Sequence, residues 1–231
     1  MANKFLQEML CADKKCVYCG REISAGTLVC DSCAREEETL RNAEGFAEGI
    51  LFAYRYEGVV RSLIHRYKYN DTPRLAPFIA QRMAEVLDDF EIGADLITFV
   101  PIHEKRLKVR GFDQTEMLAY YLSVLTGVPC ERLLVRTRDT KPQYKLNARE
   151  RWQNVHGAFA LESGVDVCEK NILLLDDVYT TGVTISECMQ VLAAAGANVM
   201  VMTYAKEFTK KKRKIKWWLK SKIRGKAKGE D

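Results

Sequence analysis

The chain has 231 residues, of which 47% are hydrophobic and 29% charged, and its formal net charge is +5 at pH 7. Such a chain can bury the core of one medium-sized domain and a small module. No apolar run approaches the roughly 20 residues of a membrane-spanning helix, and residues 1–10 lack the pattern of a secretory signal. We therefore expect a cytoplasmic protein whose eight cysteines are thiols or metal ligands rather than disulfides.

The first predicted element is a metal-binding module near the N-terminus. Two Cys-x-x-Cys pairs, separated by ten residues, are formed by Cys16, Cys19, Cys30 and Cys33. This spacing lets four thiolates surround one Zn²⁺ tetrahedrally, and a site without an open position is structural. Few large apolar residues lie nearby, so the metal would supply much of the folding free energy. The alternative is four unliganded thiols, as expected for the four cysteines outside this cluster.

A charged connector at residues 36–48 is predicted to lead into a strand at 49–56. Apolar residues at helical spacing then predict two helices, one around residues 59–67 and one around 79–87. Residues 46–90 form a candidate hood over a ligand site. Lys68 follows the first of these helices, where it either reaches an anionic ligand or lies in solvent.

Residues 97–100 predict a buried strand, and the segment after it is predicted to be a strongly basic loop. Its cations are Lys105, Arg106, Lys108 and Arg110. Clustered cations near the carboxyl end of a strand suit a doubly charged anion, and a solvated basic loop is the alternative. His103 is either a proton donor or a structural residue. A helix is predicted at 113–125.

Residues 136–154 are polar and show little periodicity, which is typical of a long loop that closes over a site. The cations that such a lid would bring to the site are Arg136, Arg138, Lys141 and Arg149. No residue in this segment is identifiable as a general base. The sequence does not indicate a pocket for a particular acceptor either.

A βαβ unit is predicted from the apolar strand at 172–175, a helical pattern that ends at Gly196, and a second strand at 198–204. Between strand and helix we expect a turn in which Thr and Gly residues offer hydroxyl and N–H groups to a phosphate. Asp176 and Asp177 begin this turn, where they would repel a phosphate, so sugar hydroxyls or a hydrated Mg²⁺ are their expected partners. A ribose 5-phosphate unit satisfies both halves. The alternative is a solvated loop with incidental acids.

The C-terminal segment is a basic tail. Residues 210–228 contain eleven of the 36 Lys and Arg residues and no acid, so the rest of the chain is net acidic. Its cations and indoles, among them Lys211, Arg213, Trp217 and Trp218, suit a nucleic-acid strand. An apolar stripe along the tail also fits an interfacial helix on an anionic membrane, and a disordered solubilising tail is the third alternative.

Two motifs carry a resemblance to a known family. The run from Asp176 to Thr184 is similar to the two acids and Thr-Thr-Gly-x-Thr turn of the type I phosphoribosyltransferases. The run from Pro101 to Gln114 and the spaced polar pattern over residues 136–159 resemble the narrower ComF branch, in which a four-cysteine zinc module precedes that domain. Asp113 replaces the Asn that is usual there. The resemblance covers about residues 16–207.

The resemblance implies an α/β fold with a type I phosphoribosyltransferase-like parallel-sheet domain at residues 46–207, a zinc-ribbon-like module and connector at 1–45, and a basic tail at 208–231. It implies binding of 5-phosphoribosyl-1-pyrophosphate with Mg²⁺. The pyrophosphate would contact the four cations of residues 105–110, and the ribose would contact Asp176 and Asp177. The 5-phosphate would lie in the turn formed by Thr180, Thr181, Gly182, Val183 and Thr184.

In related transferases the lid cations stabilise charge as pyrophosphate leaves. The ComF branch implies a role in DNA uptake during natural competence, with single-stranded DNA and a competence helicase or other uptake proteins as partners. The tail would then handle DNA or contact the inner face of the membrane. The alternative function is an active phosphoribosyltransferase that transfers ribose 5-phosphate to an unidentified nitrogen acceptor.

Overall fold

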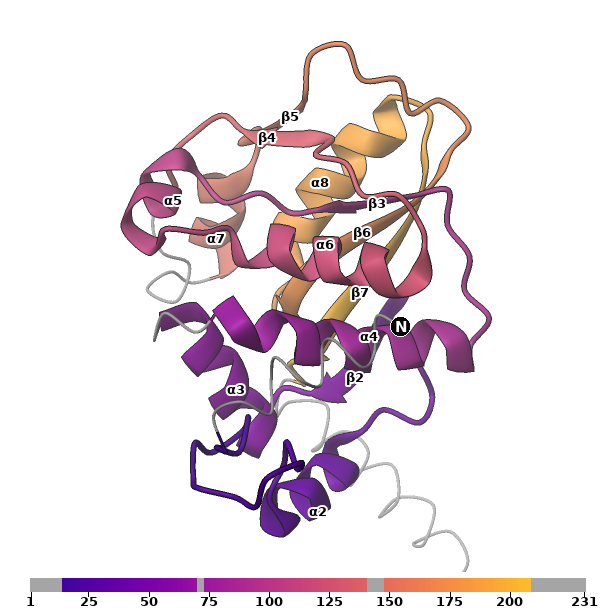
Figure 1. The fold of residues 1–231 in the computed structure, drawn as a ribbon. Coiled ribbons are helices and arrows are strands. Elements are labelled where there is room, and N and C mark those ends of the chain that lie inside the picture. The colour runs from indigo at the N-terminus through magenta and orange to yellow at the C-terminus, as the bar shows by residue number, and fades with distance from the viewer. Residues whose placement is uncertain (1–13, 70–72, 141–147, 209–231) are drawn as a thin grey trace, which may run out of the picture.

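The computed structural model describes residues 14–69, 73–140 and 148–208. They form an α/β fold around one mostly parallel sheet, with helices on both faces and a four-cysteine module at one end (Figure 1). The fold class predicted from the sequence is therefore confirmed. No helix in the described part of the chain is both long enough and apolar enough to cross a membrane.

The sheet has five strands in the order β1-β2-β7-β6-β3. Their bounds are Phe46–Ala47 for β1, Ile50–Arg55 for β2, Leu96–Phe99 for β3, Asn171–Tyr179 for β6 and Asn198–Lys206 for β7. β1 pairs antiparallel to β2, and every other pairing is parallel. The central strands β6 and β7 are buried along most of their length, which is why their sequences are apolar on both faces.

Two cores cover the two faces of the sheet. On one face, helices α3 (Gly58–Tyr69), α4 (Ala76–Asp89, after the 3₁₀ turn Pro73–Leu75) and α6 (Gln114–Thr126) pack on Leu173 and Leu175. On the other face, α8 (Val183–Ala194) and the two-stranded sheet of β4 (Leu134–Arg136) and β5 (Phe159–Leu161) pack on Ile172 and Leu174. Successive residues of β6 thus alternate between the two cores.

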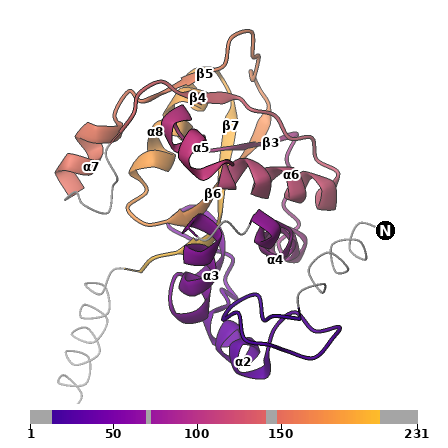
Figure 2. The same ribbon diagram turned by 60° about the vertical axis from the view of Figure 1, so that its left-hand side comes forward.

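The four-cysteine module packs directly on the sheet domain. Helix α2 (Asp31–Leu40) begins after Cys30 and lies beside α3, as Figure 2 shows. Tyr18 is fully buried: its hydroxyl lies 3.2 Å from that of Tyr204 in β7, and its ring packs edge-on against Phe78 in α4. The hydrophobic core of the module is therefore continuous with the core of the domain.

Three predictions of local structure away from β6 were wrong. The charged connector at residues 36–48 is partly helix α2 and the short strand β1, because its Glu-rich start consists of good helix formers. The basic loop after β3 is helix α5 (Glu104–Arg110), capped by His103 and closed by Gly111 at φ +78°. Helix α7 (Ala148–Val155) occupies the end of the predicted long loop.

Candidate functional site

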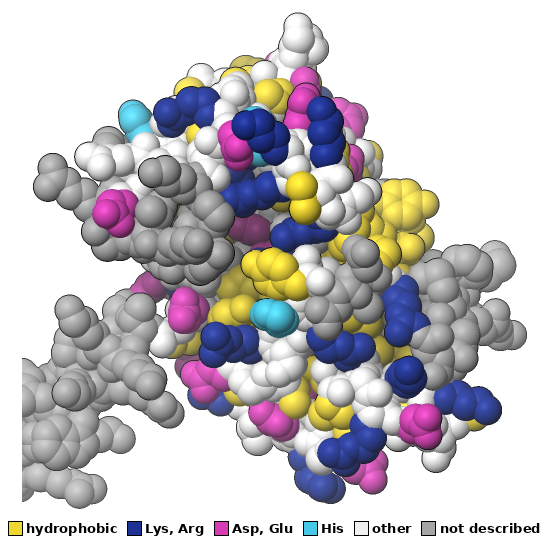
Figure 3. Space-filling view, turned by 90° about the vertical axis from the view of Figure 1, so that its left-hand side faces the viewer, with side chains coloured by type: hydrophobic (Ala, Val, Ile, Leu, Met, Phe, Trp, Pro, Cys, Tyr) yellow, Lys and Arg dark blue, Asp and Glu magenta, His cyan; other side chains and the backbone are white. Residues whose placement is uncertain are grey.

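A cavity of about 640 Å³ opens at the carboxyl ends of β3 and β6. Figure 3 shows this face of the molecule, where Lys and Arg side chains gather around a hollow. The cavity is lined by residues from α3, α5, α6, β4 and β6 and from the turn before α8. Ligands of open parallel sheets bind at this edge, as the predicted βαβ unit required.

The cavity exists because β6 is longer than its neighbour β3. The last backbone bond between them joins the Val100 N–H to the Leu175 carbonyl at 2.9 Å, and the chain then turns away at Pro101. β6 continues to Tyr179, paired only with β7 through contacts such as Asp176 with Thr203. The prediction that the strand ends at residue 175 was wrong, because the long partner strand β7 extends it past both acids.

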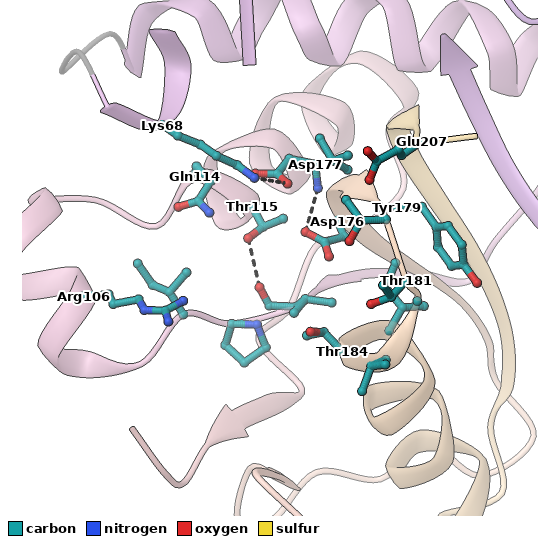
Figure 4. A pocket seen from close by; sticks show the side chains of 18 of the residues that line it. Lys68, Arg106, Gln114, Thr115, Asp176, Asp177, Tyr179, Thr181, Thr184 and Glu207 are labelled. Carbon is teal, nitrogen blue, oxygen red and sulfur yellow. Dashed lines mark hydrogen bonds and ion pairs between the residues drawn. The ribbon is translucent and has the colours of Figure 1, made fainter. Parts of the chain in front are cut away.

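The two acids of β6 therefore have different surroundings. Asp177 is 2% exposed, and its Oδ1 lies 2.7 Å from Nζ of Lys68 at the end of α3. Its Oδ2 is buried, without a hydrogen-bond partner among the described residues. Asp176 faces the opposite side of β6, toward the start of α8, and its Oδ1 accepts the N–H of Asp177 at 2.8 Å (Figure 4). Both line the cavity.

The surroundings of Asp176 alter its protonation. Burial, and then the negative charge of Asp177, raise the pKa of Asp176 to about 8. Burial lowers the pKa of Lys68, but the charges of Asp177 and Asp176 outweigh it, so the Lys68 pKa is raised. At neutral pH this side of the cavity holds a Lys–Asp ion pair and a second acid that carries a proton for much of the time. Sugar hydroxyls and a divalent cation both remain suitable partners for it.

The predicted phosphate turn lies between β6 and α8, with all five of its residues, Thr180 to Thr184, along the cavity wall. Gly182 is the N-cap of α8 at φ +74°, in the left-handed region that favours glycine. A Cβ atom there would lie 2.2 Å from the Tyr179 hydroxyl, so a side chain would also force Tyr179 to move. The turn presents the N-terminus of a twelve-residue helix, whose first-turn N–H groups and dipole favour an anion.

Helix α5 places some of the predicted pyrophosphate residues at the cavity and others away from it. Arg106 and Arg110 are one helical turn apart, and both line the cavity (Figure 4 labels Arg106). Lys105 is 73% exposed and pairs with Asp139 at 3.2 Å. Lys108 is exposed and absent from the cavity wall. The structure thus brings two of the four cations to the cavity.

Arg136 at the end of β4 is a further cation of the cavity wall. Burial, and then the nearby charge of Arg106, lower its pKa to about 10. Its guanidinium lies 5.2 Å from the Phe159 ring and bonds to the Thr140 hydroxyl, whereas Arg106 donates to the Thr140 carbonyl at 3.1 Å. The Nε of Arg136 is buried without a partner among the described residues. Two arginines held together at a buried position favour an anion between them.

Of the other lid candidates, the structure describes the side chain of Arg138. Arg138 donates to the His156 carbonyl at 2.5 Å and is absent from the cavity wall. Lys141 and the side chain of Arg149 fall outside what the structure describes. His103 accepts the Lys105 N–H at 3.2 Å through Nδ1, as the cap of α5.

Asp113 fixes the loop after β3, which contributes Ile102 to the cavity wall. It caps α6, where its Oδ1 accepts the Thr115 N–H at 3.0 Å and its Oδ2 accepts the Ile102 N–H at 3.0 Å. Burial raises the pKa of Asp113, and these bonds oppose that shift. An Asn at this position has one such acceptor oxygen, whereas the carboxylate has two.

Several further wall residues were not singled out as site residues from the sequence. Tyr56, Gln114, Thr115 and Glu207 reach the cavity from separate parts of the chain. Of these, Gln114 and Thr115 lie in or beside the motif shared with the ComF branch, which was the one clue to them. Lys68 was expected in either of two roles, and it faces the site.

The four cysteines of the module meet as predicted. The sulfur atoms of Cys16, Cys19, Cys30 and Cys33 all lie within 4.8 Å of one another. Bonds of about 2.3 Å from a tetrahedral Zn²⁺ would place sulfur atoms about 3.8 Å apart, and Cys19 and Cys30 are 3.9 Å apart. The donor set therefore fits a structural metal ion.

The proposed nucleic-acid residues Lys211, Arg213, Trp217 and Trp218 lie outside the described residues.

Comparison with known proteins relates the chain to DNA utilization and competence proteins. It is 30% identical over 190 residues to the DNA utilization protein YhgH of Escherichia coli strain K12, covering 79% of each chain. It is 26% identical over 191 residues to competence protein F of Haemophilus influenzae, covering 79% of this chain and 80% of that one. No family model matches the chain.

Among solved structures, the chain is similar to the adenine phosphoribosyltransferase of Leishmania tarentolae. The two are 16% identical, and the superposition covers 73% of this chain and 81% of the other with a TM-score of 0.42. That superposition is partial, and the fold class rests on the strand order and layers described above.

Proposed function

Given that the chain belongs to the ComF family of competence and DNA utilization proteins, we propose that its cavity binds 5-phosphoribosyl-1-pyrophosphate and that the protein handles single-stranded DNA during DNA uptake. The proposed ligand carries an anion at each end of a ribose. It therefore needs two anion sites separated by a partner for hydroxyl groups. Those three kinds of group surround the cavity.

The observation that carries the proposal is the arrangement of charge around the 640 Å³ cavity. The N-terminus of α8 supplies N–H groups for the 5-phosphate at Thr181 and Gly182. Arg106, Arg110 and Arg136 supply cations for the pyrophosphate. Asp176 lies on the strand from which the phosphate turn continues, where it would accept bonds from the ribose hydroxyls.

A protonated Asp176 is compatible with this binding mode. Its raised pKa means that the empty cavity does not hold two full negative charges beside the phosphate turn. Cations that arrive with the ligand, such as Mg²⁺, would favour the ionised form. We therefore expect Mg²⁺ to strengthen binding, and more strongly above pH 8, where Asp176 is ionised, than below it.

The direct test is calorimetric titration of the zinc-loaded protein with 5-phosphoribosyl-1-pyrophosphate, with and without Mg²⁺. Helix α5 supplies a matched pair of variants, because Arg106 lines the cavity and Lys108 does not. We expect Arg106→Ala to weaken binding at least about tenfold, the equivalent of one hydrogen bond to a charged group, and Lys108→Ala to leave it unchanged. An absence of binding by the parent protein would refute the ligand, and equal losses in both variants would refute its placement.

An active phosphoribosyltransferase is the second candidate function. Arg106 and Arg136 favour it, since two closely held cations would also stabilise pyrophosphate as it leaves. The ribose would pass to a nitrogen acceptor. Turnover would be established by pyrophosphate release that depends on an added nitrogen acceptor and that Arg136→Ala abolishes. Binding without release would indicate a ligand-binding protein.

A further inference from the structure

Helix α3 lies between the four-cysteine module and the end of β6 (Figure 2). It contributes Lys68 and Tyr69 to the cavity wall. Two of its cations, Arg66 and Lys68, are two positions apart. At about 100° per residue, their side chains leave the helix on nearly opposite sides. Arg66 faces the module, whereas Lys68 faces the cavity.

Arg66 bonds to the backbone of the turn that contains Cys16 and Cys19. Its Nη1 donates to the carbonyls of Val17 at 2.7 Å and Tyr18 at 3.1 Å, and it reaches that of Cys16 at 3.5 Å. Gly20 lies in this turn at φ +74°, in the left-handed region that favours glycine. The carbonyls converge on Arg66 only while the turn of Cys16 and Cys19 keeps its shape.

The second cysteine pair holds the beginning of the same helix. Cys30 precedes α2 and Cys33 lies within it. From the second turn of α2, Glu36 accepts the N–H of Val59 at 3.2 Å through Oε1, at the first turn of α3. A metal ion bound by both cysteine pairs would therefore connect the two contacts that fix α3, one through Arg66 and one through Glu36.

On its opposite side, α3 places Lys68 at a largely buried position, where a lysine needs an ionic partner. The Lys68 side chain is 23% exposed and that of Asp177 is 3% exposed. Their 2.7 Å contact leaves Oδ2 of Asp177 without a partner among the described residues, so Lys68 is the cation that compensates this buried charge. A small movement of α3 would break the pair, since buried ion pairs depend on close geometry.

We propose that metal binding in the four-cysteine module holds Lys68 on Asp177, with Arg66 as the positioning residue that links the two sites. Without the metal, the two cysteine pairs separate, the carbonyls around Arg66 diverge, and α3 loses its fixed position. Lys68 then leaves Asp177. The consequence for ligand affinity rests on the proposed function, whereas the link from metal to Lys68 does not.

Amine acylation of the full-length protein, followed by mass spectrometry of each lysine, tests this link without any ligand. Lys105, which is 73% exposed, reports the unhindered rate, and the Lys206 side chain, which is 3% exposed, reports whether the sheet stays folded. The arms are the zinc-loaded parent, the parent after chelation, and zinc-loaded Arg66→Ala and Arg66→Lys. Arg41→Ala is the matched control, because Arg41 also ties the end of α2 to the domain, but its ion pair, with Asp89 at 3.1 Å, goes to α4 and not to α3.

We expect Lys68 to react about tenfold faster in zinc-loaded Arg66→Ala than in the parent, a factor equivalent to losing one hydrogen bond to a charged group. Arg66→Lys, which keeps the charge but not the forked donors, should be intermediate, and Arg41→Ala should match the parent. Zinc content and Lys206 protection should be unchanged. An unchanged Lys68 rate in both Arg66 variants overturns the proposal, as does chelation that leaves Lys68 protected. If Arg66→Ala loses its zinc, the acylation rate of Lys68 in zinc-loaded Arg66→Lys provides the test. A rate above that of the parent supports the proposal, and an unchanged rate overturns it.

Discussion

The hydroxyl of Tyr179 occupies the space that a side chain at residue 182 would need, 2.2 Å from the position of a Cβ atom on Gly182. Lys206 packs against Tyr179, with its Nζ 3.9 Å from the centre of the Tyr179 ring. Lys206 is itself almost fully buried and pairs with Glu48 at 3.1 Å. These contacts give the turn that we propose to bind phosphate a defined shape.

This contact predicts that Gly182→Ala is more damaging than backbone strain alone would make it. Gly127 provides the control, because it has φ +76° against +74° for Gly182 and nothing within 4 Å of its Cβ position. We expect Gly127→Ala to cost about 1–2 kcal/mol of unfolding free energy, and Gly182→Ala to cost about 1–3 kcal/mol more. Denaturant unfolding measures both. Equal losses would mean that Tyr179 yields without cost.

The raised pKa of Asp176 predicts a pH-dependent stability. In the unfolded chain an aspartate titrates near about pH 3.9, whereas in the folded protein Asp176 titrates at about 8. Between these values the folded state holds the proton more tightly, so this residue's contribution to stability decreases as pH rises from about 4 to about 8. Asp176→Asn removes that loss.

We expect the unfolding free energy of Asp176→Asn to gain about 1–3 kcal/mol on the parent between pH 5.5 and pH 8. Thermal or denaturant unfolding at several pH values provides the measurement. Asp139→Asn is the control, because the hydrogen bond from Lys105 lowers the pKa of this exposed acid instead. Parallel profiles of Asp176→Asn and the parent would contradict the raised pKa.

The sulfur cluster predicts different effects for two exposed cysteines. Cys19 belongs to the cluster and Cys168 does not. We expect Cys19→Ser to lose bound zinc and at least about 3 kcal/mol of unfolding free energy, a part of the roughly 10–16 kcal/mol that such sites contribute. Cys168→Ser should keep both. Metal analysis and thermal unfolding test this, and full zinc content in Cys19→Ser would exclude it as a ligand.

The basic tail predicts a salt-dependent interaction with single-stranded DNA. Deleting residues 210–231 removes eleven Lys and Arg residues. We expect weaker binding, and a salt dependence whose logarithmic slope decreases by about 0.7 for each DNA phosphate that the shortened protein no longer neutralises. Replacing Trp217 and Trp218 by Ala in the full chain should weaken binding with little change in that slope, since stacking carries no charge. Equal affinity after the deletion would exclude the tail as the DNA-binding segment.

Much of the fold was predictable because the patterns that indicate it are local. The apolar run of β6, the helical spacing of α8 and the strand β7 follow from residues within a few positions of one another. The same holds for the four cysteines and for the turn at Gly182, each of which is a short motif. The errors at the connector and at α5 arose where charge was weighed above helix propensity.

By itself, the sequence determined the fold class, the cysteine cluster and the position of the Thr/Gly turn before α8, because spacing along the chain is sufficient for each. Only the tertiary structure decided which charges meet. It pairs Lys68 with Asp177, turns Asp176 to the other face of β6, brings Arg136 beside Arg106, and places Arg66 inside the first cysteine turn. These partners come from different elements, so their contacts depend on how helices pack on the sheet, which no local pattern specifies.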